Sequence, residues 1–219
     1  MADTKTTYIL LPEVDARMIN GSLFERDIYK DLATGKEGDP RYKAQVAFAD
    51  TEENRDALND IIVKELIAEW GESAEEEFFE GKISDPLRNG DKLKAAREAK
   101  GKSGDAFGGM IVLSADTKYN RNGDDAEGGV ATFDEMAEVV PMLQKDKFYN
   151  GCFVKLSVTV SCWEGTDRTG KFRAVKFYLQ GVQFVKDGER LRATARNPFS
   201  QQVRDAGEGG RERKRQRKT

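Results

Sequence analysis

Apolar and polar residues alternate most regularly in two adjacent segments of the chain. The segments are GCFVKLSVTVSCW at 151–163 and KFRAVKFYLQGVQFV at 171–185, and the polar sequence EGTDRTG lies between them. Alternation with a period of two is typical of β-strands that bury one face, and a short polar link favours an antiparallel hairpin. We therefore predict a β-hairpin over residues 151–185, with a bulge at Gly181 that resets the alternation.

The two faces of the predicted hairpin differ in character. On the first strand, every second residue from Cys152 to Cys162 is apolar, and these residues share one face. On the second strand, Val175, Phe177 and Leu179 continue this apolar face. This face is expected to line a core, which leaves the opposite face toward solvent. The residues of the opposite face are Phe153, Lys155, Ser157, Thr159, Ser161, Trp163, Phe172, Lys176, Tyr178 and Gln180, with Lys171 and Arg173 at the turn.

Patterns elsewhere predict further strands and a helical region. Short β-strand patterns occupy residues 8–11, 16–24, 41–49 and 110–115. Apolar residues at helical spacing predict a helix that begins after a cap at Asp50 or Thr51 and ends near Trp70. Shorter helical stretches are expected at 75–80 and 91–100.

Glycine, proline and charge mark the loops and the end of the predicted domain. The Gly-, Pro- and Asp-rich residues 30–40 predict a loop, and the acidic residues 116–146 predict a long loop with at most one helical turn. Residues 197–219 have little apolar surface to bury and are expected to form a disordered basic tail. The chain is thus predicted to hold one mainly β domain at 1–196, with a helical insertion at about 50–109.

The formal net charge of −3 conceals a partition between acidic and basic segments. Residues 50–146 sum to −12, whereas residues 147–196, which contain the hairpin, sum to +6 and residues 197–219 to +4. A basic hairpin in an otherwise acidic chain favours a polyanionic partner. Uneven loop charge is the alternative explanation.

Composition and spacing exclude several classes of chemistry. The chain has no histidine, which excludes Ser-His-Asp and Cys-His nucleophiles and zinc sites with a histidine ligand. GKS at 101–103 lacks the first glycine of a phosphate loop, because Ala96 stands there. KYNRNGDDAEGG places Lys118 and Gly129 at the first and last ligand positions of a calcium loop, where carboxylates are needed. We expect no catalytic activity, no cofactor and no metal ion.

The sequence also favours a soluble protein of a reducing compartment. No window is long and apolar enough for a membrane-spanning helix, and MADTKTTYILLPEVD lacks the features of a secretory signal. Cys152 and Cys162 lie ten residues apart in one predicted strand. At that spacing they are roughly 33 Å apart and cannot form a disulfide with each other. We therefore expect an intracellular protein that does not enter a membrane.

Aromatic rings interleaved with basic side chains on a solvent face are typical of surfaces that bind single-stranded nucleic acid. The rings stack on bases, and the cations attract phosphates. The predicted basic contacts are Lys43, Lys155, Lys171, Arg173 and Lys176, the predicted stacking residues are Phe153, Trp163, Phe172 and Tyr178, and Tyr119 and Arg121 are expected to close over the strand from the acidic loop. The alternative is that Phe153, Trp163 and Phe172 pack beneath the acidic loop.

Several segments together carry a family resemblance. They are GDPRYKAQVAFAD, DPLRNGD, GDAFGGMIVLSA, FYNGCFVKLSVTVSCW and LQGVQFVKDGERL, within about residues 14 to 192. In this order they resemble the phage single-stranded DNA-binding protein family, formerly a domain of unknown function. The resemblance implies a five-stranded OB-fold barrel with inserted helices, which binds single-stranded DNA without catalysis. Family members often end in an acidic, aromatic tail, whereas residues 211–219 hold six basic residues and one acidic residue.

We accordingly predict sequence-tolerant binding and protection of single-stranded DNA during phage DNA replication and recombination in the host cytoplasm. Two other functions stay open. One is RNA binding or strand annealing. The other is an interaction scaffold whose basic tail alone contacts nucleic acid.

Overall fold

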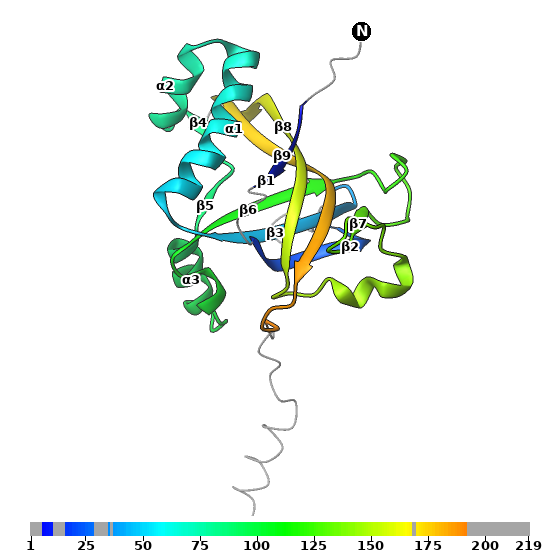
Figure 1. Ribbon diagram of the computed structural model, residues 1–219. Coiled ribbons are helices and arrows are strands. Elements are labelled where there is room, and N and C mark those ends of the chain that lie inside the picture. The colour runs from blue at the N-terminus through cyan, green and yellow to red at the C-terminus, as the bar shows by residue number, and fades with distance from the viewer. Residues whose placement is uncertain (1–5, 11–15, 29–34, 36, 168–169, 192–219) are drawn as a thin grey trace, which may run out of the picture.

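The computed structural model describes residues 6–10, 16–28, 35, 37–167 and 170–191 (Figure 1). The basic tail predicted at 197–219 and most of the loop predicted at 30–40 lie outside the described residues.

Strands predominate among the described elements. The strands are β1 (Thr7–Leu10), β2 (Ala16–Asp27), β3 (Arg41–Ala49), β4 (Ile83–Ser84), β5 (Arg88–Asn89), β6 (Met110–Thr117), β7 (Ala131–Phe133), β8 (Phe153–Asp167) and β9 (Gly170–Lys186). The α-helices are α1 (Glu52–Trp70), α2 (Ser73–Phe79) and α3 (Gly90–Glu98), and the 3₁₀-helices are η1 (Asp105–Phe107) and η2 (Met142–Lys147). The fold is therefore mainly β with helices inserted between β3 and β6, as predicted.

Five strands close into a barrel. β2 pairs with β3 and β3 with β6 in antiparallel fashion, β6 pairs in parallel with β9, and β9 pairs in antiparallel fashion with β8. The ring closes where β8 pairs with β2 through Ala16 and Arg17, opposite Val154 and Phe153. This strand order is that of an OB-fold barrel. The predicted fold class is confirmed.

The predicted hairpin is confirmed as β8 and β9, and so is the direction of its apolar face, whereas Thr159 of the predicted solvent face is buried. Val154, Leu156, Val158 and Val160 are buried in the barrel from β8, and Val175, Phe177, Leu179, Val182 and Phe184 are buried from β9. A register shift opposite Ser157 and Val158 leaves Gln180 as the extra residue of a bulge, directly before Gly181. This bulge restores the inward direction of the apolar residues after it.

The helix α1 closes one end of the barrel core. Leu58, Ile62 and Leu66 are fully buried at helical spacing and belong to the same core cluster as the barrel strands. The hydroxyl of Thr51 caps the helix by accepting a hydrogen bond from the backbone amide of Asn54 at 3.3 Å. The predicted helix and one of its two predicted caps are thus observed.

A second, smaller apolar cluster lies outside the barrel. Ile19 of β2, Ala47 of β3 and Val112 of β6 are buried there against Phe107 of η1, and Leu191 packs on the same cluster. The segment of α3 and η1 therefore covers part of the outer barrel face. This covering was not predicted, because nothing in the sequence indicates which segment packs on the outward residues of these strands.

The segment after β9 is attached to the barrel by close backbone packing. The phenol of Tyr149 donates to the Asp187 carboxylate at 2.8 Å and accepts from the amide of Gly188 at 3.0 Å. The amide of Leu191 donates to the carbonyl of Asn150 at 2.8 Å. We call residues 187–191 the C-terminal strap.

Three further sequence predictions concern the acidic loop, the two cysteines and membrane-spanning helices. Within the predicted acidic loop, Ala131–Phe133 form the short strand β7 beside β9, and a 3₁₀-helix follows at Met142–Lys147. Cys152 and Cys162, both described, form no disulfide. In the described part of the chain, no helix is long and apolar enough to cross a membrane.

The strap generates a first testable prediction. Gly151 has φ +115°, and a Cβ atom there would overlap the carbonyl of Glu189. Replacing Gly151 by Ala should lower the free energy of unfolding by about 2–4 kcal/mol, because backbone strain and overlap add. Gly123→Ala is the control, since Gly123 has φ +82° with open space around it and should lose about 1 kcal/mol. Urea unfolding that shows equal losses would contradict the close packing of the strap.

Candidate nucleic-acid interface

A groove of about 890 Å³ lies on the outer face of the barrel. Its floor is formed by β2 and β3, one wall by α3 and η1, and the other wall by the C-terminal strap. The residues along it are Arg17, Ile19, Asn20, Gln45, Arg97, Lys102, Ser103, Asp105, Ala106, Phe107, Asn150, Glu189, Arg190 and Leu191. OB-fold barrels bind oligonucleotides on the outer face of their second and third strands, which here are β3 and β6.

The basic side chains of this groove are not neutralised by carboxylates. Arg17 donates to the backbone carbonyl of Glu189 at 2.9 Å, and Arg97 donates to that of Ser103 at 2.9 Å. The guanidinium of Arg190 lies 4.1 Å from the ring centroid of Tyr149. Among the described residues, no carboxylate is within ion-pairing distance of Arg17, Arg97, Lys102 or Arg190. Their positive charge therefore remains available to an anionic ligand. We call these four residues the groove cations.

A row of polar side chains continues from the groove across three strands. Gln45 lines the groove and donates to Ser114 on β6 at 3.0 Å. Two residues earlier on the same face of β3, Lys43 stands opposite Asp116 of β6, which in turn stands opposite Tyr178 of β9. We call the outward residues Lys43, Gln45, Ser114, Asp116, Lys176 and Tyr178 the outer track.

The basic residues of the outer track are ion-paired, unlike the groove cations. Lys176 contacts the Asp116 carboxylate at 3.0 Å and lies 5.2 Å from the ring centroid of Tyr178. Arg41 contacts the same carboxylate at 2.9 Å, and Lys43 pairs with Asp27 at 2.9 Å. A phosphate that binds to Lys43 or Lys176 would compete with these carboxylates. Such partly exposed pairs are weak, so this exchange costs little.

The tip of the hairpin carries an exposed aromatic pair. The rings of Trp163 and Phe172 are edge to face, with centroids 5.0 Å apart, and Trp163 is 47% exposed. Gly165 lies beneath both rings, where a Cβ atom would be too close to either of them. Lys171 is exposed next to the pair. The arrangement leaves about half of Trp163 open to solvent.

Arg173 does not share the solvent face of the hairpin. It contacts Glu77 of α2 at 2.9 Å and Glu164 of β8 at 2.8 Å, and it lies 4.9 Å from the ring centroid of Trp70. These contacts attach the hairpin to the helices. The predicted DNA contact by Arg173 would require it to leave two carboxylates and a ring.

The start of β8 borders the groove. Phe153 is half-buried and stands opposite Arg17, which lines the groove. The ammonium of Lys186 lies 5.0 Å from the ring centroid of Phe153. Lys155, two residues later on the same face, is half-buried opposite Gln183. Phe153 is therefore a neighbour of Arg17, one of the groove cations.

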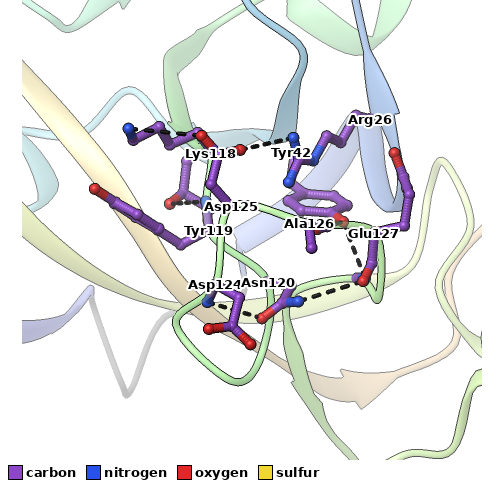
Figure 2. A network of polar contacts seen from close by, with 11 residues as sticks. Arg26, Tyr42, Lys118, Tyr119, Asn120, Asp124, Asp125, Ala126 and Glu127 are labelled. Carbon is purple, nitrogen blue, oxygen red and sulfur yellow. Dashed lines mark hydrogen bonds and ion pairs between the residues drawn. The ribbon is translucent and has the colours of Figure 1, made fainter.

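The loop that holds Tyr119 and Arg121 is fixed by a polar network (Figure 2). The phenol of Tyr42 donates to the carbonyl of Ala126 at 3.0 Å and accepts from the amide of Gly129 at 3.2 Å. The side-chain oxygen of Asn120 accepts from the amide of Asp124 at 3.1 Å. This network attaches the loop to β3 and fixes its backbone.

Tyr119 and Arg121 occupy different environments in that loop. Tyr119 is 48% exposed, and the ammonium of Lys118 lies 5.0 Å from its ring centroid. Arg121 is half-buried and donates to the carbonyl of Gly128 at 3.0 Å. Both line a small pocket with Gln180, two residues beyond Tyr178 of the outer track. The predicted loop residues therefore lie near one end of the track.

The described residues include no group of three or more carboxylates and thiols that could hold a metal ion. Burial raises the pKa of the Cys152 thiol to about 11, so it is protonated at neutral pH and a poor nucleophile.

A family model described as Enterobacter phage Enc34, ssDNA-binding protein, matches residues 22–208, which is most of the chain. The chain belongs to this family. No curated protein matches the sequence.

Solved structures of two phage proteins are similar to the chain. The single-stranded DNA-binding protein from bacteriophage Enc34 in complex with ssDNA is 16% identical, with 82% of this chain and 87% of that chain covered and a TM-score of 0.49. The single-stranded DNA-binding protein gp2.5 of bacteriophage T7 is 14% identical, with 91% and 96% covered and a TM-score of 0.47.

The structure brings some of the predicted binding residues together and separates others. Lys43, Lys176 and Tyr178 meet in the outer track, and Trp163, Phe172 and Lys171 meet at the hairpin tip. Phe153 and Lys155 lie at the other end of β8. The groove cations were missed, because they come from β2, the helical insertion and the strap, which have no common sequence signal.

The exposed aromatic pair yields a second prediction. Trp163→Ala should weaken binding to single-stranded DNA by roughly 1–3 kcal/mol per lost stacked base while leaving the melting temperature nearly unchanged. Met136→Ala is a matched control, because Met136 is 77% exposed in another loop. Oligonucleotide binding followed by fluorescence anisotropy, with thermal unfolding in parallel, gives both quantities. A large fall in melting temperature for Trp163→Ala alone would show that this ring serves the fold.

Proposed function

We propose that this chain binds single-stranded DNA without sequence preference, along a path from the groove over the outer track. The observation that most supports this proposal is the set of four groove cations that no described carboxylate neutralises, which lie beside the β3–β6 face that OB folds use for oligonucleotides. Membership of a single-stranded DNA-binding protein family supports the same ligand.

Each part of this path has its own task in the proposed complex. The groove cations attract phosphates, while Phe153 beside the groove and Tyr178 on the track offer ring faces to bases. Trp163 and Phe172 extend the stacking surface to the hairpin tip. Since every base has a π-face, binding through rings and phosphates tolerates any sequence.

The proposed biological role is the protection of single strands during phage DNA replication and recombination in the host cytoplasm. Family membership supports a binding protein rather than an enzyme. RNA of the same length serves as a competitor in the tests below, since a 2′-hydroxyl contact would favour RNA over DNA.

The groove generates a third prediction. Replacing Arg97 and Lys102 by Gln should weaken binding to single-stranded DNA and reduce the salt slope by about 0.7 for each lost phosphate contact. The control replaces Lys64 and Lys82, two exposed lysines of the helical insertion, and changes the net charge equally. Binding is measured with oligo-dT, duplex DNA and RNA over a salt series. Equal loss in both variants would contradict the groove as the site.

The basic segment 211–219 generates a fourth prediction. It adds six basic residues and one acidic residue, which contact phosphates of any nucleic acid without regard to strandedness. A chain that ends at Gly210 should bind duplex DNA much more weakly and should show a greater preference for single strands. The measurement compares oligo-dT with duplex at two salt concentrations. Loss of all single-strand binding in the shortened chain would instead favour the scaffold function.

A further inference from the structure

A second, smaller pocket lies at one end of the outer track. Its volume is about 250 Å³, and Thr117 of β6 and Gln180 of β9 are among the residues that line it. Thr117 directly follows Asp116 of the track, and Gln180 comes two residues after Tyr178. A strand that follows the track therefore arrives at this pocket, which we call the end pocket. Drug-sized ligands occupy pockets of roughly 300–1,000 Å³, so the end pocket suits a single nucleobase.

Hydrogen bonds within the loop after β6 hold one wall of the end pocket in place. The side-chain oxygen of Asn120 accepts from the amides of Asn122 at 2.8 Å and Asp124 at 3.1 Å. The amide of Arg121 donates to the carbonyl of Gly129 at 2.7 Å. A ligand therefore meets a wall that is already formed, which lowers the entropic cost of binding.

The guanidinium of Arg121, which lines the end pocket, has a donor group to spare. Its Nε donates to the carbonyl of Gly128 at 3.0 Å, whereas its Nη2 is buried without a hydrogen-bond partner among the described residues. A buried donor without a partner is unfavourable, so most such groups in proteins are paired. An acceptor group bound in the end pocket would therefore be stabilising.

The β-bulge of β9 contributes a second polar group to the end pocket. Gln180 is the extra residue of this bulge, and bulges commonly redirect a side chain beside a binding site. The side-chain nitrogen of Gln180 donates to the hydroxyl of Thr159 at 3.0 Å, which leaves its side-chain oxygen as an acceptor. Tyr119 adds an exposed ring to the same pocket. The end pocket thus combines a donor, an acceptor and an aromatic ring.

We propose that the end pocket binds one base of the bound strand and prefers guanine. Guanine presents two adjacent acceptors, O6 and N7, which match an arginine side chain such as Arg121. Adenine and cytosine present an amino donor at that edge, and thymine presents one acceptor beside a methyl group. The N–H donors on the pairing edge of guanine suit the oxygen of Gln180. This inference rests on the proposed DNA binding and adds a preference at one nucleotide, while the rest of the path tolerates any sequence.

Oligonucleotides that differ at one base test the proposal. The series is oligo-dT of fixed length and the same oligonucleotide with one central dG, dA, dC or 7-deaza-dG, which lacks the N7 acceptor. In fluorescence anisotropy, the dG oligonucleotide should bind the full chain roughly fivefold more tightly than oligo-dT, or better. The dA and dC oligonucleotides should resemble oligo-dT, and 7-deaza-dG should lose most of the gain. Equal binding of the whole series would overturn the proposal, as would a preference for dA or dC, or one that 7-deaza-dG retains in full.

Two variants test whether the preference comes from the end pocket. Arg121→Lys keeps the charge but loses the planar set of donors, and Gln180→Ala removes the acceptor. Each should lower the ratio of dG affinity to oligo-dT affinity toward one. The matched controls Arg88→Lys and Gln144→Ala change exposed residues of β5 and η2 and should leave this ratio unchanged. An unchanged ratio in both pocket variants, or an equal fall in the controls, would overturn the proposal.

The same series separates this inference from folding defects and from the proposed function. Thermal unfolding of each variant shows whether it folds. If Arg121→Lys does not fold, Gln180→Ala and the comparison of dG with 7-deaza-dG on the unaltered chain decide the outcome. Failure of the unaltered chain to bind oligo-dT would contradict the proposed function. Tight binding of oligo-dT without a preference for dG would contradict this inference alone.

Discussion

Backbone pairing of β9 is the constraint on which the rest of the structure depends. One edge of β9 pairs with β8 along most of its length, and the other edge pairs in turn with β4, β6 and β7. Closure of the barrel pairs the backbone N–H and C=O groups of the strand edges and turns the alternating apolar residues inward. The same closure necessarily turns Lys176, Tyr178 and Phe172 outward, on the side where a ligand can reach them.

The distribution of charge follows from this closed barrel. Outward residues of neighbouring strands come within contact distance, and there Arg41 and Lys176 share the carboxylate of Asp116. Three of the groove cations, Arg97, Lys102 and Arg190, come from elements that surround the sheet. The fourth, Arg17 of β2, donates to the backbone carbonyl of Glu189 in place of a carboxylate. Arg97 and Arg190 contact carbonyls or rings in place of carboxylates. Local pairing thus neutralises the middle of the face, while its margin keeps a net positive charge.

The sequence was sufficient for elements whose signal is local. Period-two alternation predicted the buried face of the hairpin, and the helical spacing of Leu58, Ile62 and Leu66 predicted α1, because each pattern reports one buried face. The covering of β2, β3 and β6 by η1 could not be predicted, since Phe107 gives no periodic signal.

In the candidate site too, features with a local sequence pattern could be predicted, and contacts between distant segments could not. Trp163 and Phe172 could be assigned to one solvent face from alternation alone. Alternation also places Arg173 on the face of Val175 and Phe177 and away from the solvent face, and its partner Glu77 lies on that side. Arg17 and Arg97 lie far apart in sequence, and the closed barrel with its helical insertion brings them to one groove.

In the proposed complex, single-stranded DNA lies along the groove, the outer track and the aromatic hairpin tip. Ultraviolet crosslinking of the full chain to oligo-dT that carries 5-iododeoxyuridine, followed by mass spectrometry, tests it most directly, because the crosslinks form at rings in contact with the bases. The account predicts crosslinks at Phe153, Tyr178 and the Trp163–Phe172 pair. Crosslinks confined to α1 and α2, with none on the hairpin, would contradict it.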